Sequence, residues 1–220
     1  MSQATKTMHD TRSILTTLAV LVCLAAMPAA PAAAVSPWEL LADMRVALEE
    51  DGPLTGKFEQ TYIPAGFSDG DVESGYLSLW LPRCLRWNYE EPQEKSFLLC
   101  DGEVYFWNPE DEGGRHYEID PKEEPGLDLL MLGVSELRER YVADSEKLAD
   151  GTYRISLAVP ADVGGDFHAT IHVDPVARRV VGLEYTDDEG NLTRFAISDY
   201  QKLAHTGLFQ PPQGIEWTDE

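Results

Sequence analysis

The stretch that decides the fold is Cys84-Leu85-Arg86-Trp87-Asn88-Tyr89, followed shortly afterwards by Ser96-Phe97-Leu98-Leu99-Cys100. Apolar and polar residues alternate along the first segment, as they do in a β-strand with one buried face. The second segment is another strand candidate, and Glu91-Pro92-Gln93 between the two is typical of a turn. The stretch therefore predicts a hairpin of two antiparallel strands.

Pairing the two strands about Pro92 fixes which residues face each other, and it places Cys84 opposite Cys100. Directly opposite residues have Cα atoms about 4.5–5.5 Å apart, which is within disulfide range. We therefore expect a Cys84–Cys100 disulfide in an oxidising compartment, with a pair of buried free thiols as the alternative. One face of the hairpin then carries its large apolar side chains, namely Leu85, Trp87, Tyr89, Phe97 and Leu99.

Further strands are expected along the chain, separated by turn dipeptides such as Asp101-Gly102 and Asp150-Gly151. A spacing of about ten residues between such strands indicates an antiparallel meander. No long linker or internal repeat divides the chain, so residues 35–220 are expected to form one domain. The expected strands outside the hairpin are Gly56–Tyr62, Ser74–Leu81, Glu103–Trp107, Thr152–Val159, Phe167–Val173, Val180–Thr186 and Leu192–Ser198.

Two segments are expected to be helical. Ser36-Pro37-Trp38-Glu39 has the pattern of a capping box with proline at the first helical position, and it predicts a helix to about Glu50. The apolar side of that helix would carry Leu41, Met44, Ala47 and Leu48. The second segment, between Pro125 and Tyr141, is rich in leucine but is interrupted by Gly133. It is interpreted either as a lid over an open face of the sheet or as an ordinary core helix.

The N-terminus has the features of a secretory signal peptide. Lys6 and Arg12 precede an apolar run from Ile14 to Met27, and Ala32-Ala33-Ala34 supplies the small residues of a cleavage site. The run is shorter than the roughly 20 residues that a membrane span needs. A lipoprotein signal with Cys23 as the acylated residue is the other alternative, although Cys23 lies inside the apolar run. We therefore expect residues 1–34 to be removed and the protein to act in the periplasm.

The charge and the residue motifs limit the classes of function. A formal net charge of −22 repels nucleic-acid phosphates and anionic membrane surfaces, and it favours a basic surface on a protein partner. Neither a Gly-x-Ser-x-Gly nor a His-Glu-x-x-His motif occurs in the sequence. His168 and His172 fall on an expected strand, where residues four apart are separated by about 13 Å, too far to share one metal. We assign no catalytic residue, no metal and no cofactor.

Several short motifs occur together in one order. From Gly75 to Pro109 these are Gly75-x-Leu77, Pro82, Arg86-Trp87-x-Tyr89, Glu91-Pro92, Asp101-Gly102 and Asn108-Pro109. Phe58-Glu59-Gln60 precedes them, and Phe209-Gln210-Pro211-Pro212-Gln213-Gly214 follows them. In this order and spacing the motifs resemble those of the periplasmic lipoprotein carrier family LolA, and they extend over nearly all of residues 35–220.

The resemblance implies a mainly β fold with few helices, a half-open barrel of about eleven antiparallel strands that encloses a hydrophobic cavity beneath a helical lid. In that family the cavity receives lipoprotein acyl chains from the inner-membrane ABC transporter LolCDE, and the carrier delivers them to the outer-membrane receptor LolB. A monomeric periplasmic chaperone without enzymatic activity is therefore implied. The residues expected to line its lipid cavity are Phe58, Leu77, Leu79, Leu85, Trp87, Tyr89, Phe97, Leu99, Leu130, Met131 and Val134.

The sequence departs from the family at one position. In the family an arginine precedes the proline after the Gly-x-Leu strand, and its hydrogen bonds hold the lid closed, whereas this chain has Leu81 there, with Arg83 and Arg86 close by. Either another residue holds the lid, or the closed state is less favoured. The departure also admits carriers or sensors of other lipids, such as glycolipids or hopanoids. An enzyme is the third alternative, for which no nucleophile or base can be assigned.

Overall fold

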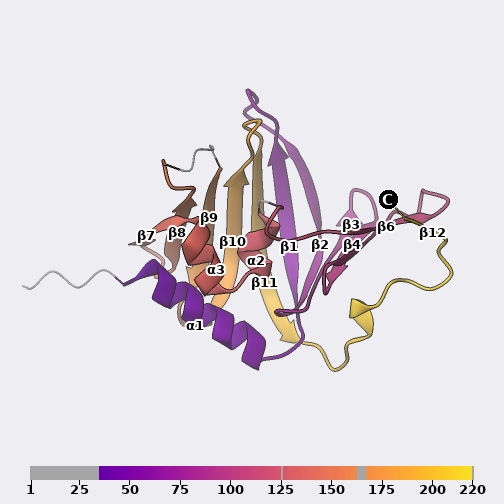
Figure 1. Cartoon of the computed structure of the whole chain (residues 1–220), viewed down its shortest axis with the longest axis horizontal. Coiled ribbons are helices and arrows are strands. Elements are labelled where there is room, and N and C mark those ends of the chain that lie inside the picture. The colour runs from indigo at the N-terminus through magenta and orange to yellow at the C-terminus, as the bar shows by residue number, and fades with distance from the viewer. Residues whose placement is uncertain (1–34, 125, 163–166, 220) are drawn as a thin grey trace, which may run out of the picture. The chain divides into compact units, whose positions relative to one another are not determined.

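The computed structural model describes residues 35–124, 126–162 and 167–219. The expected signal peptide, residues 1–34, lies outside the described residues. Helix α1 (Pro37–Glu50) comes first and is followed by strands, with two short helices, α2 (Leu127–Met131) and α3 (Val134–Arg140), near the middle of the chain (Figure 1). Within the described ranges, no helix is long and apolar enough to cross a membrane.

The strands form one open sheet in the order β12-β6-β5-β4-β3-β2-β1-β11-β10-β9-β8-β7. Neighbouring strands are antiparallel except β12, which pairs parallel with β6. The mainly β, antiparallel fold with few helices is thus confirmed. The strands are β1 (Leu54–Ile63), β2 (Asp71–Trp80), β3 (Cys84–Glu91), β4 (Lys95–Cys100), β5 (Glu103–Trp107), β6 (Gly114–Glu118), β7 (Val142–Lys147), β8 (Tyr153–Ala158), β9 (His168–Asp174), β10 (Arg179–Thr186), β11 (Leu192–Lys202) and β12 (Trp217–Asp219).

The register of the β3–β4 hairpin confirms the pairing predicted from the sequence. Cys84 lies opposite Cys100, Leu85 opposite Leu99 and Trp87 opposite Phe97. The two cysteines are joined by a disulfide, with their Cα atoms 4.2 Å apart. Because side chains alternate between the two faces of a strand, this register sends the large apolar residues to one face and the disulfide to the other.

Helix α1 begins and ends where the sequence predicts, but its N-terminus is not a capping box. Ser36 is the N-cap residue, yet its side chain makes no capping hydrogen bond. Pro37 at the first helical position already lacks a backbone N–H, so one of the unpaired donors of the first turn is absent. The helix buries Leu41, Met44, Ala47 and Leu48 as expected, and it also buries Arg45.

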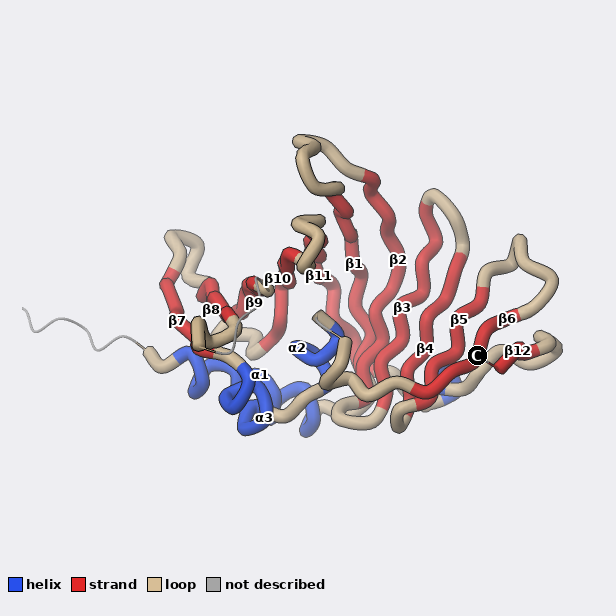
Figure 2. Tube along the Cα trace, turned by 45° about the horizontal axis from the view of Figure 1, so that its top comes forward, coloured by secondary structure: helices blue, strands red, loops and turns tan. Residues whose placement is uncertain are grey.

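The leucine-rich segment folds as two short helices instead of one. Helix α2 ends before Leu132, and Gly133 is the N-cap of α3, where its backbone N–H donates to a carboxylate oxygen of Glu136 at 3.1 Å. The three helices lie against the same face of the sheet (Figure 2). Their apolar residues join the strands in one large core, so α2 and α3 cover that face of the sheet.

A second, smaller apolar cluster lies on the other face of the sheet, under the C-terminal segment. Its buried members are Cys84 and Leu98 together with Phe209 from the short helix η1 (Gly207–Phe209). The sequence did not predict this packing, because the hairpin face with the disulfide carries polar residues between its apolar ones. The C-terminal segment then continues into β12, at the edge of the sheet.

Three strands, β6, β7 and β12, were not predicted from the sequence. Strand β6 begins at Gly114 directly after another glycine, which is a pattern more typical of a turn. Strand β7 has no buried residue among its six, and β12 has only three residues. All three segments are strands because they pair with a neighbouring strand, and the hydropathy pattern of a segment does not show such pairing.

Candidate binding cavity

A cavity of about 280 Å³ lies between the sheet and the segment that leads into α2. Residues from both halves of the sheet line it, and the α2 segment supplies the opposite wall. The lining residues are Gln60, Trp87, Tyr89, Phe97, Tyr117, Ile119, Glu124, Gly126, Leu127, Leu130, Leu183, Tyr185 and Phe195.

Four of the residues expected to face a lipid line this cavity, namely Trp87, Tyr89, Phe97 and Leu130. The other seven belong to the same apolar core but do not line the cavity: Phe58, Leu77, Leu79, Leu85, Leu99 and Met131 are buried within the core, and Val134 packs against it. Leu77, Leu85 and Leu99 have no exposed surface at all. The structure therefore brings all eleven together, some as walls and the rest as the packing behind them.

Aromatic rings form one wall. Trp87 stacks on Phe195 with ring centroids 4.6 Å apart, and Phe58 meets the Trp87 and Tyr89 rings edge to face. Such ring pairs contribute about 0.5–1.5 kcal/mol beyond the apolar area that they bury. These ring contacts join the β1–β3 part of the sheet to β11.

Polar groups lie among the apolar ones. The Tyr89 hydroxyl donates to Gln60 Oε1 at 2.6 Å, and burial raises the pKa of the Tyr89 phenol. Burial also raises the pKa of Tyr185, and Glu124 lines the same space. The cavity can therefore contact both a hydrocarbon chain and a polar group attached to it.

Glycine is required where the chain enters α2. Gly126 has a φ of 90°, a conformation that residues with a Cβ rarely adopt. A Cβ at this position would lie 2.8 Å from a carbon of the Tyr185 ring. The backbone can therefore pass directly over Tyr185, which brings Leu127 to the cavity wall.

A buried arginine joins α1 to α2. Arg45 is 8% exposed, and its two terminal nitrogens donate to the backbone carbonyls of Leu130 and, at 2.6 Å, Met131. Its Nε donates to Glu49 Oε1 at 2.9 Å. Burial lowers the pKa of the Arg45 guanidinium, and the hydrogen bond with Glu49 opposes that shift. Arg45 thus binds the last carbonyls of the helix whose Leu130 lines the cavity.

The sequence itself holds a signal for the buried role of Arg45. The apolar side of α1 includes Leu41 and Leu48, and Arg45 lies four residues after the first and three before the second. Residues at these spacings share one face of a helix, so a cation in that stripe needs a buried partner.

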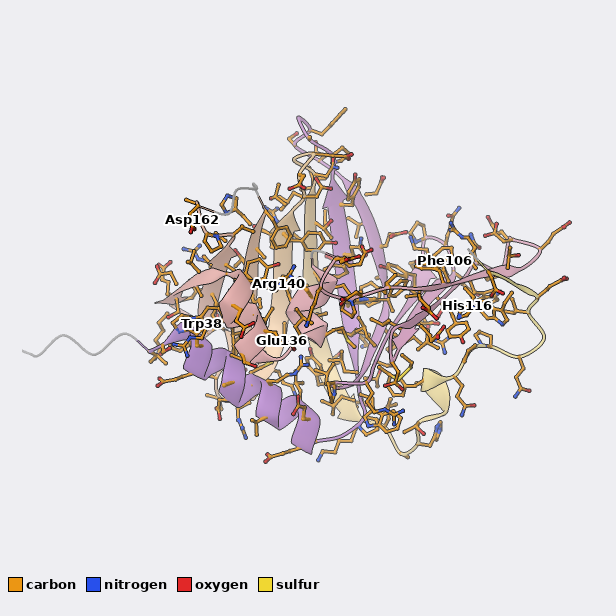
Figure 3. The ribbon with its side chains drawn as sticks, viewed as in Figure 1. Trp38, Phe106, His116, Glu136, Arg140 and Asp162 are labelled. Atoms are coloured by element: carbon orange, nitrogen blue, oxygen red, sulfur yellow. A yellow bond between two sulfur atoms is a disulfide. The ribbon has the colours of Figure 1, made fainter. Side chains whose placement is uncertain are left out.

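A buried carboxylate holds the other end of α2. Asp128 has no exposed surface; its Oδ1 accepts from the Gly126 backbone N–H at 3.1 Å, and its Oδ2 accepts from the Tyr141 hydroxyl. Arg140 of α3, which Figure 3 labels, has its Nε 3.5 Å from Asp128 Oδ2. Burial raises the pKa of Asp128, and Tyr141 and Arg140 oppose that shift. No sequence pattern singled out Asp128, because it lies inside a leucine-rich run.

The position where an arginine was expected is apolar in the structure as well. Leu81 is buried in the main core, next to Pro82. Residues 35–124, 126–162 and 167–219 contain no group of three or more His, Cys, Asp or Glu side chains that could hold a metal ion.

Comparison with known proteins identifies relatives over most of the chain. The family model for the outer membrane lipoprotein carrier protein LolA matches residues 52–211. An outer-membrane lipoprotein carrier protein of Methylococcus capsulatus is 22% identical over 177 residues, which cover 77% of this chain and 82% of that protein. A second one, from Xanthomonas oryzae pv. oryzae, is 24% identical over 172 residues, covering 74% and 80% of the two chains.

The fold also has a counterpart among solved structures. An uncharacterized conserved protein from Thermus thermophilus superimposes with a TM-score of 0.55 at 9% sequence identity. The match covers 83% of this chain and 98% of the other. At this identity the likeness concerns the fold alone.

Proposed function

The chain belongs to the outer membrane lipoprotein carrier protein LolA family, and we propose that it binds the acyl chains of lipoproteins in the cavity between the sheet and α2. The observation that carries the proposal is that Trp87, Phe97 and Leu130, brought together from separate elements, contribute apolar surface to one cavity. Each methylene that moves from water into such a space contributes about 0.8 kcal/mol. Burial of a single acyl chain can therefore supply enough free energy for a stable complex.

The size of the cavity implies that binding requires movement. Its volume of about 280 Å³ is slightly below the range of ligand pockets, which run from about 300 to 1,000 Å³. A lipid with more than one long chain needs more room than this. We infer that the described state is the closed one and that α2 moves away from the sheet when lipid enters.

Arg45 would control this movement. Opening the space under Leu130 separates the two carbonyls of α2 from the guanidinium, and each hydrogen bond to a charged group contributes about 1.5–3 kcal/mol. The free energy lost with two such bonds is offset by the free energy gained when roughly four to eight methylenes are buried. An acyl chain is long enough to displace α2, whereas a short apolar molecule is not. Arg45 would thereby take the part expected of an arginine at position 81.

The contacts at the start of α2 would act as the hinge. Asp128 is bound by Gly126 and Tyr141, which lie before and after the two short helices, so that end of α2 is fixed on both sides. Arg45 binds the opposite end, at Leu130 and Met131. Release of Arg45 alone would let α2 swing about Asp128 without losing its place in the fold.

The cellular role follows from the family. We propose that the chain acts in the periplasm as a chaperone without enzymatic activity, receives lipoproteins from the LolCDE transporter and delivers them to LolB or an equivalent receptor. Reversible transfer requires a bound state that is only moderately favourable, which a lid held by two hydrogen bonds supplies. The net charge of −22 would attract basic docking surfaces on these partners.

A second candidate cargo is a lipid with a polar head, such as a glycolipid or a hopanoid. The observation that favours it is the set of polar groups at Gln60, Tyr89 and Glu124 in the cavity wall. A hydroxylated head group could hydrogen-bond to these residues while its hydrocarbon part contacts the aromatic wall.

Uptake of a fluorescent acyl probe by a cavity variant tests acyl-chain binding. We choose Leu127→Glu, because Leu127 lines the cavity but is only half-buried, whereas Trp87 is also packed in the core and its replacement would disturb folding. The matched control is Phe67→Glu in the exposed β1–β2 turn, where the side chain is 72% exposed. We expect loss of uptake in the first variant only. Equal uptake by both folded variants would exclude this cavity as the acyl site.

A further inference from the structure

A second hollow, of about 300 Å³, lies on the face of the sheet opposite the lipid cavity. Strands β1, β2 and β3 supply most of its walls, and the C-terminal segment closes one side. Its lining residues are Thr55, Tyr76, Ser78, Arg86, Asn88 and Leu208. None of these six side chains is acidic, in a chain with 39 acidic residues.

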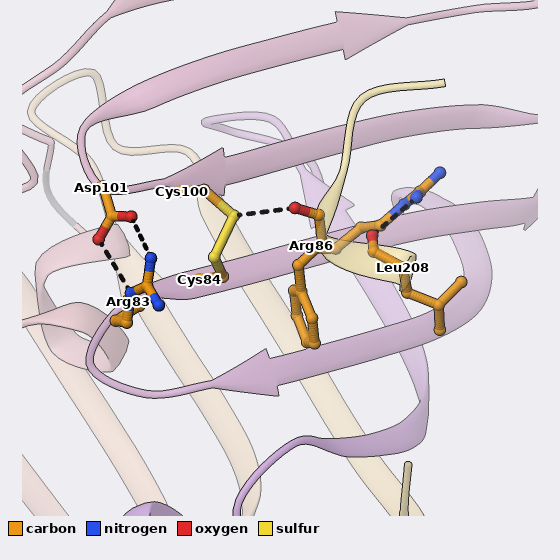
Figure 4. The surroundings of a disulfide bond; sticks show 7 residues. Arg83, Cys84, Arg86, Cys100, Asp101 and Leu208 are labelled. Atoms are coloured by element: carbon orange, nitrogen blue, oxygen red, sulfur yellow. Dashed lines mark hydrogen bonds and ion pairs between the residues drawn. A yellow bond between two sulfur atoms is a disulfide. The ribbon is translucent and has the colours of Figure 1, made fainter. Parts of the chain in front are cut away.

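Arg86 is the charged group of this hollow. Its Nε donates to Ser96 Oγ at 3.0 Å. Its Nη1 donates to the Leu208 carbonyl at 2.9 Å (Figure 4), and the two bonds together fix the plane of the guanidinium. A guanidinium has five N–H donors, and the other three have no hydrogen-bond partner in the described part of the chain. Neighbouring Arg83, by contrast, is paired with Asp101 at 2.8 Å.

Among the described residues, no anion balances the cost of placing a cation in this hollow. Burial lowers the pKa of the Arg86 guanidinium, and no carboxylate opposes the shift. A half-buried charge normally has a partner of opposite sign. An unpaired, oriented guanidinium in a strongly acidic protein therefore indicates a place for an anion from outside.

The neighbouring polar groups favour the same kind of ligand. The Ser78 hydroxyl donates to Thr55 Oγ1, and the Thr55 hydroxyl donates to the Leu77 carbonyl, so both hydroxyl protons are used within the protein. Asn88 lies two residue pairs further along the sheet, opposite Tyr76, and lines the hollow together with Arg86. The amide can donate to an oxygen atom held by the guanidinium.

We propose that this hollow is an anion-binding site for an oxyanion, a phosphate or a carboxylate group, held by a bidentate pair of hydrogen bonds from Arg86 with the Asn88 amide as a further donor. Planar guanidinium groups match two acceptor oxygens in this way, and such pairs are stronger than neutral hydrogen bonds. The site lies on the opposite face from the lipid cavity, so an anionic group of a partner could bind while cargo is held. Leu208 adjoins the bound group and links the site to the C-terminal segment.

The test is an NMR titration with sodium phosphate and, separately, sodium acetate at constant ionic strength, followed at the backbone N–H resonances of Tyr76 and Leu208, which line the hollow and are present in every variant. We expect a saturable shift. Arg86→Lys keeps the positive charge but removes the planar pair of guanidinium donors, and it should weaken anion binding by about tenfold. Asn88→Leu removes the amide donor, leaves both hydrogen bonds of Arg86 in place, and should also weaken binding. Tighter binding of phosphate assigns the site to phosphate groups, and tighter binding of acetate assigns it to carboxylates.

The control is Arg115→Gln, which removes an exposed arginine that lies over the Phe106 ring at 4.7 Å and should leave the titration unchanged. Leu127→Glu should leave it unchanged as well, so that failure of this site is separate from failure of the lipid cavity. The proposal is overturned if neither anion gives a saturable shift, or if binding is equally tight in Arg86→Lys, Asn88→Leu and the unaltered protein.

Discussion

Replacing Arg45 by methionine is the most informative perturbation of the lid. Methionine keeps the apolar stem and much of the length of the side chain, so the packing of α1 is retained while the charge is lost. The variant loses the hydrogen bonds to the Leu130 and Met131 carbonyls, each worth about 1.5–3 kcal/mol. We take about 3 kcal/mol as the lower bound for the pair, which corresponds to about a hundredfold more opening of α2.

Hydrogen exchange measured residue by residue reads this opening directly. The Leu132 N–H donates to the Asp128 carbonyl at 2.9 Å in the closed state. This bond lies within α2, and a helix of 5 residues that has left the sheet is not stable in water, so the N–H exchanges once α2 opens. We expect its exchange rate to rise about a hundredfold in Arg45→Met, while core strand amides such as that of Leu77 stay protected. The variant should also take up acyl probes faster, because the lid no longer has to be displaced.

The matched control is Arg138→Met on α3, where the guanidinium lies over the Trp38 ring at 6.0 Å. It removes the same charge from a neighbouring helix without touching the α2 carbonyls, so exchange of the Leu132 N–H should be unchanged. Unaltered α2 exchange in a folded Arg45→Met protein would refute the latch. An equal rise in α2 and in the core strands would show that Arg45 contributes only to global stability.

Three further predictions concern the contacts around the cavity and at the sheet edge. Burial raises the folded-state pKa of Asp128, so this carboxyl stabilises the folded state most at low pH, and its contribution is lost as pH rises from the unfolded pKa of about 3.8 through the folded pKa. Asp128→Asn should remove that part of the pH dependence of the unfolding free energy, measured by chemical unfolding. An unchanged pH profile in the variant would contradict the assignment. Hydrogen bonds to the carboxylates of Asp219 and Glu103 raise the pKa of His116. The stabilising effect of His116 on β12 is therefore complete below the unfolded pKa of about 6.5 and is lost as pH rises through the folded pKa. Hydrogen exchange of the β12 amides should increase over that pH range in the unaltered protein, but not in His116→Gln. Replacing Cys84 and Cys100 together by alanine opens a loop with a sequence separation of 16, which should lower the unfolding free energy by about 3 kcal/mol and the melting temperature by roughly 6–12 °C. A fall in melting temperature of less than about 2 °C would mean that the disulfide does not stabilise the fold.

The hairpin and most of the strands could be predicted because alternation is a local signal. The pairing of Cys84 with Cys100 required only a turn centred on Pro92 and a period of two residues. The apolar face of the hairpin follows from the same register, and it supplied Trp87, Tyr89 and Phe97 of the cavity wall. Leu183, Tyr185 and Phe195 were missed, although they alternate on predicted strands, because the sequence does not say which strand ends meet α2.

Features that depend on distant contacts could not be read in the same way. Arg45 was assigned to no role because its partners are backbone carbonyls 85 and 86 residues away, which have no sequence signature. The one signal for it was a cation within the apolar stripe of α1, between Leu41 and Leu48, because Leu81 in place of an expected arginine left open both another latch and a less favoured closed state. Asp128 and the C-terminal cover over Leu98 belong to the same class, because tertiary packing alone gives them their environment.

Native mass spectrometry of the protein purified from the periplasm tests the central proposal, acyl-chain binding, most directly. We predict a population that carries an acylated peptide or protein, and we predict that it is lost in Leu127→Glu and retained in Phe67→Glu. Co-purification of glycolipid or another free lipid, without acylated peptide, would assign the cavity to the second candidate cargo. Protein that is free of any lipid, and that takes up none when acylated peptide is supplied, would contradict the proposal.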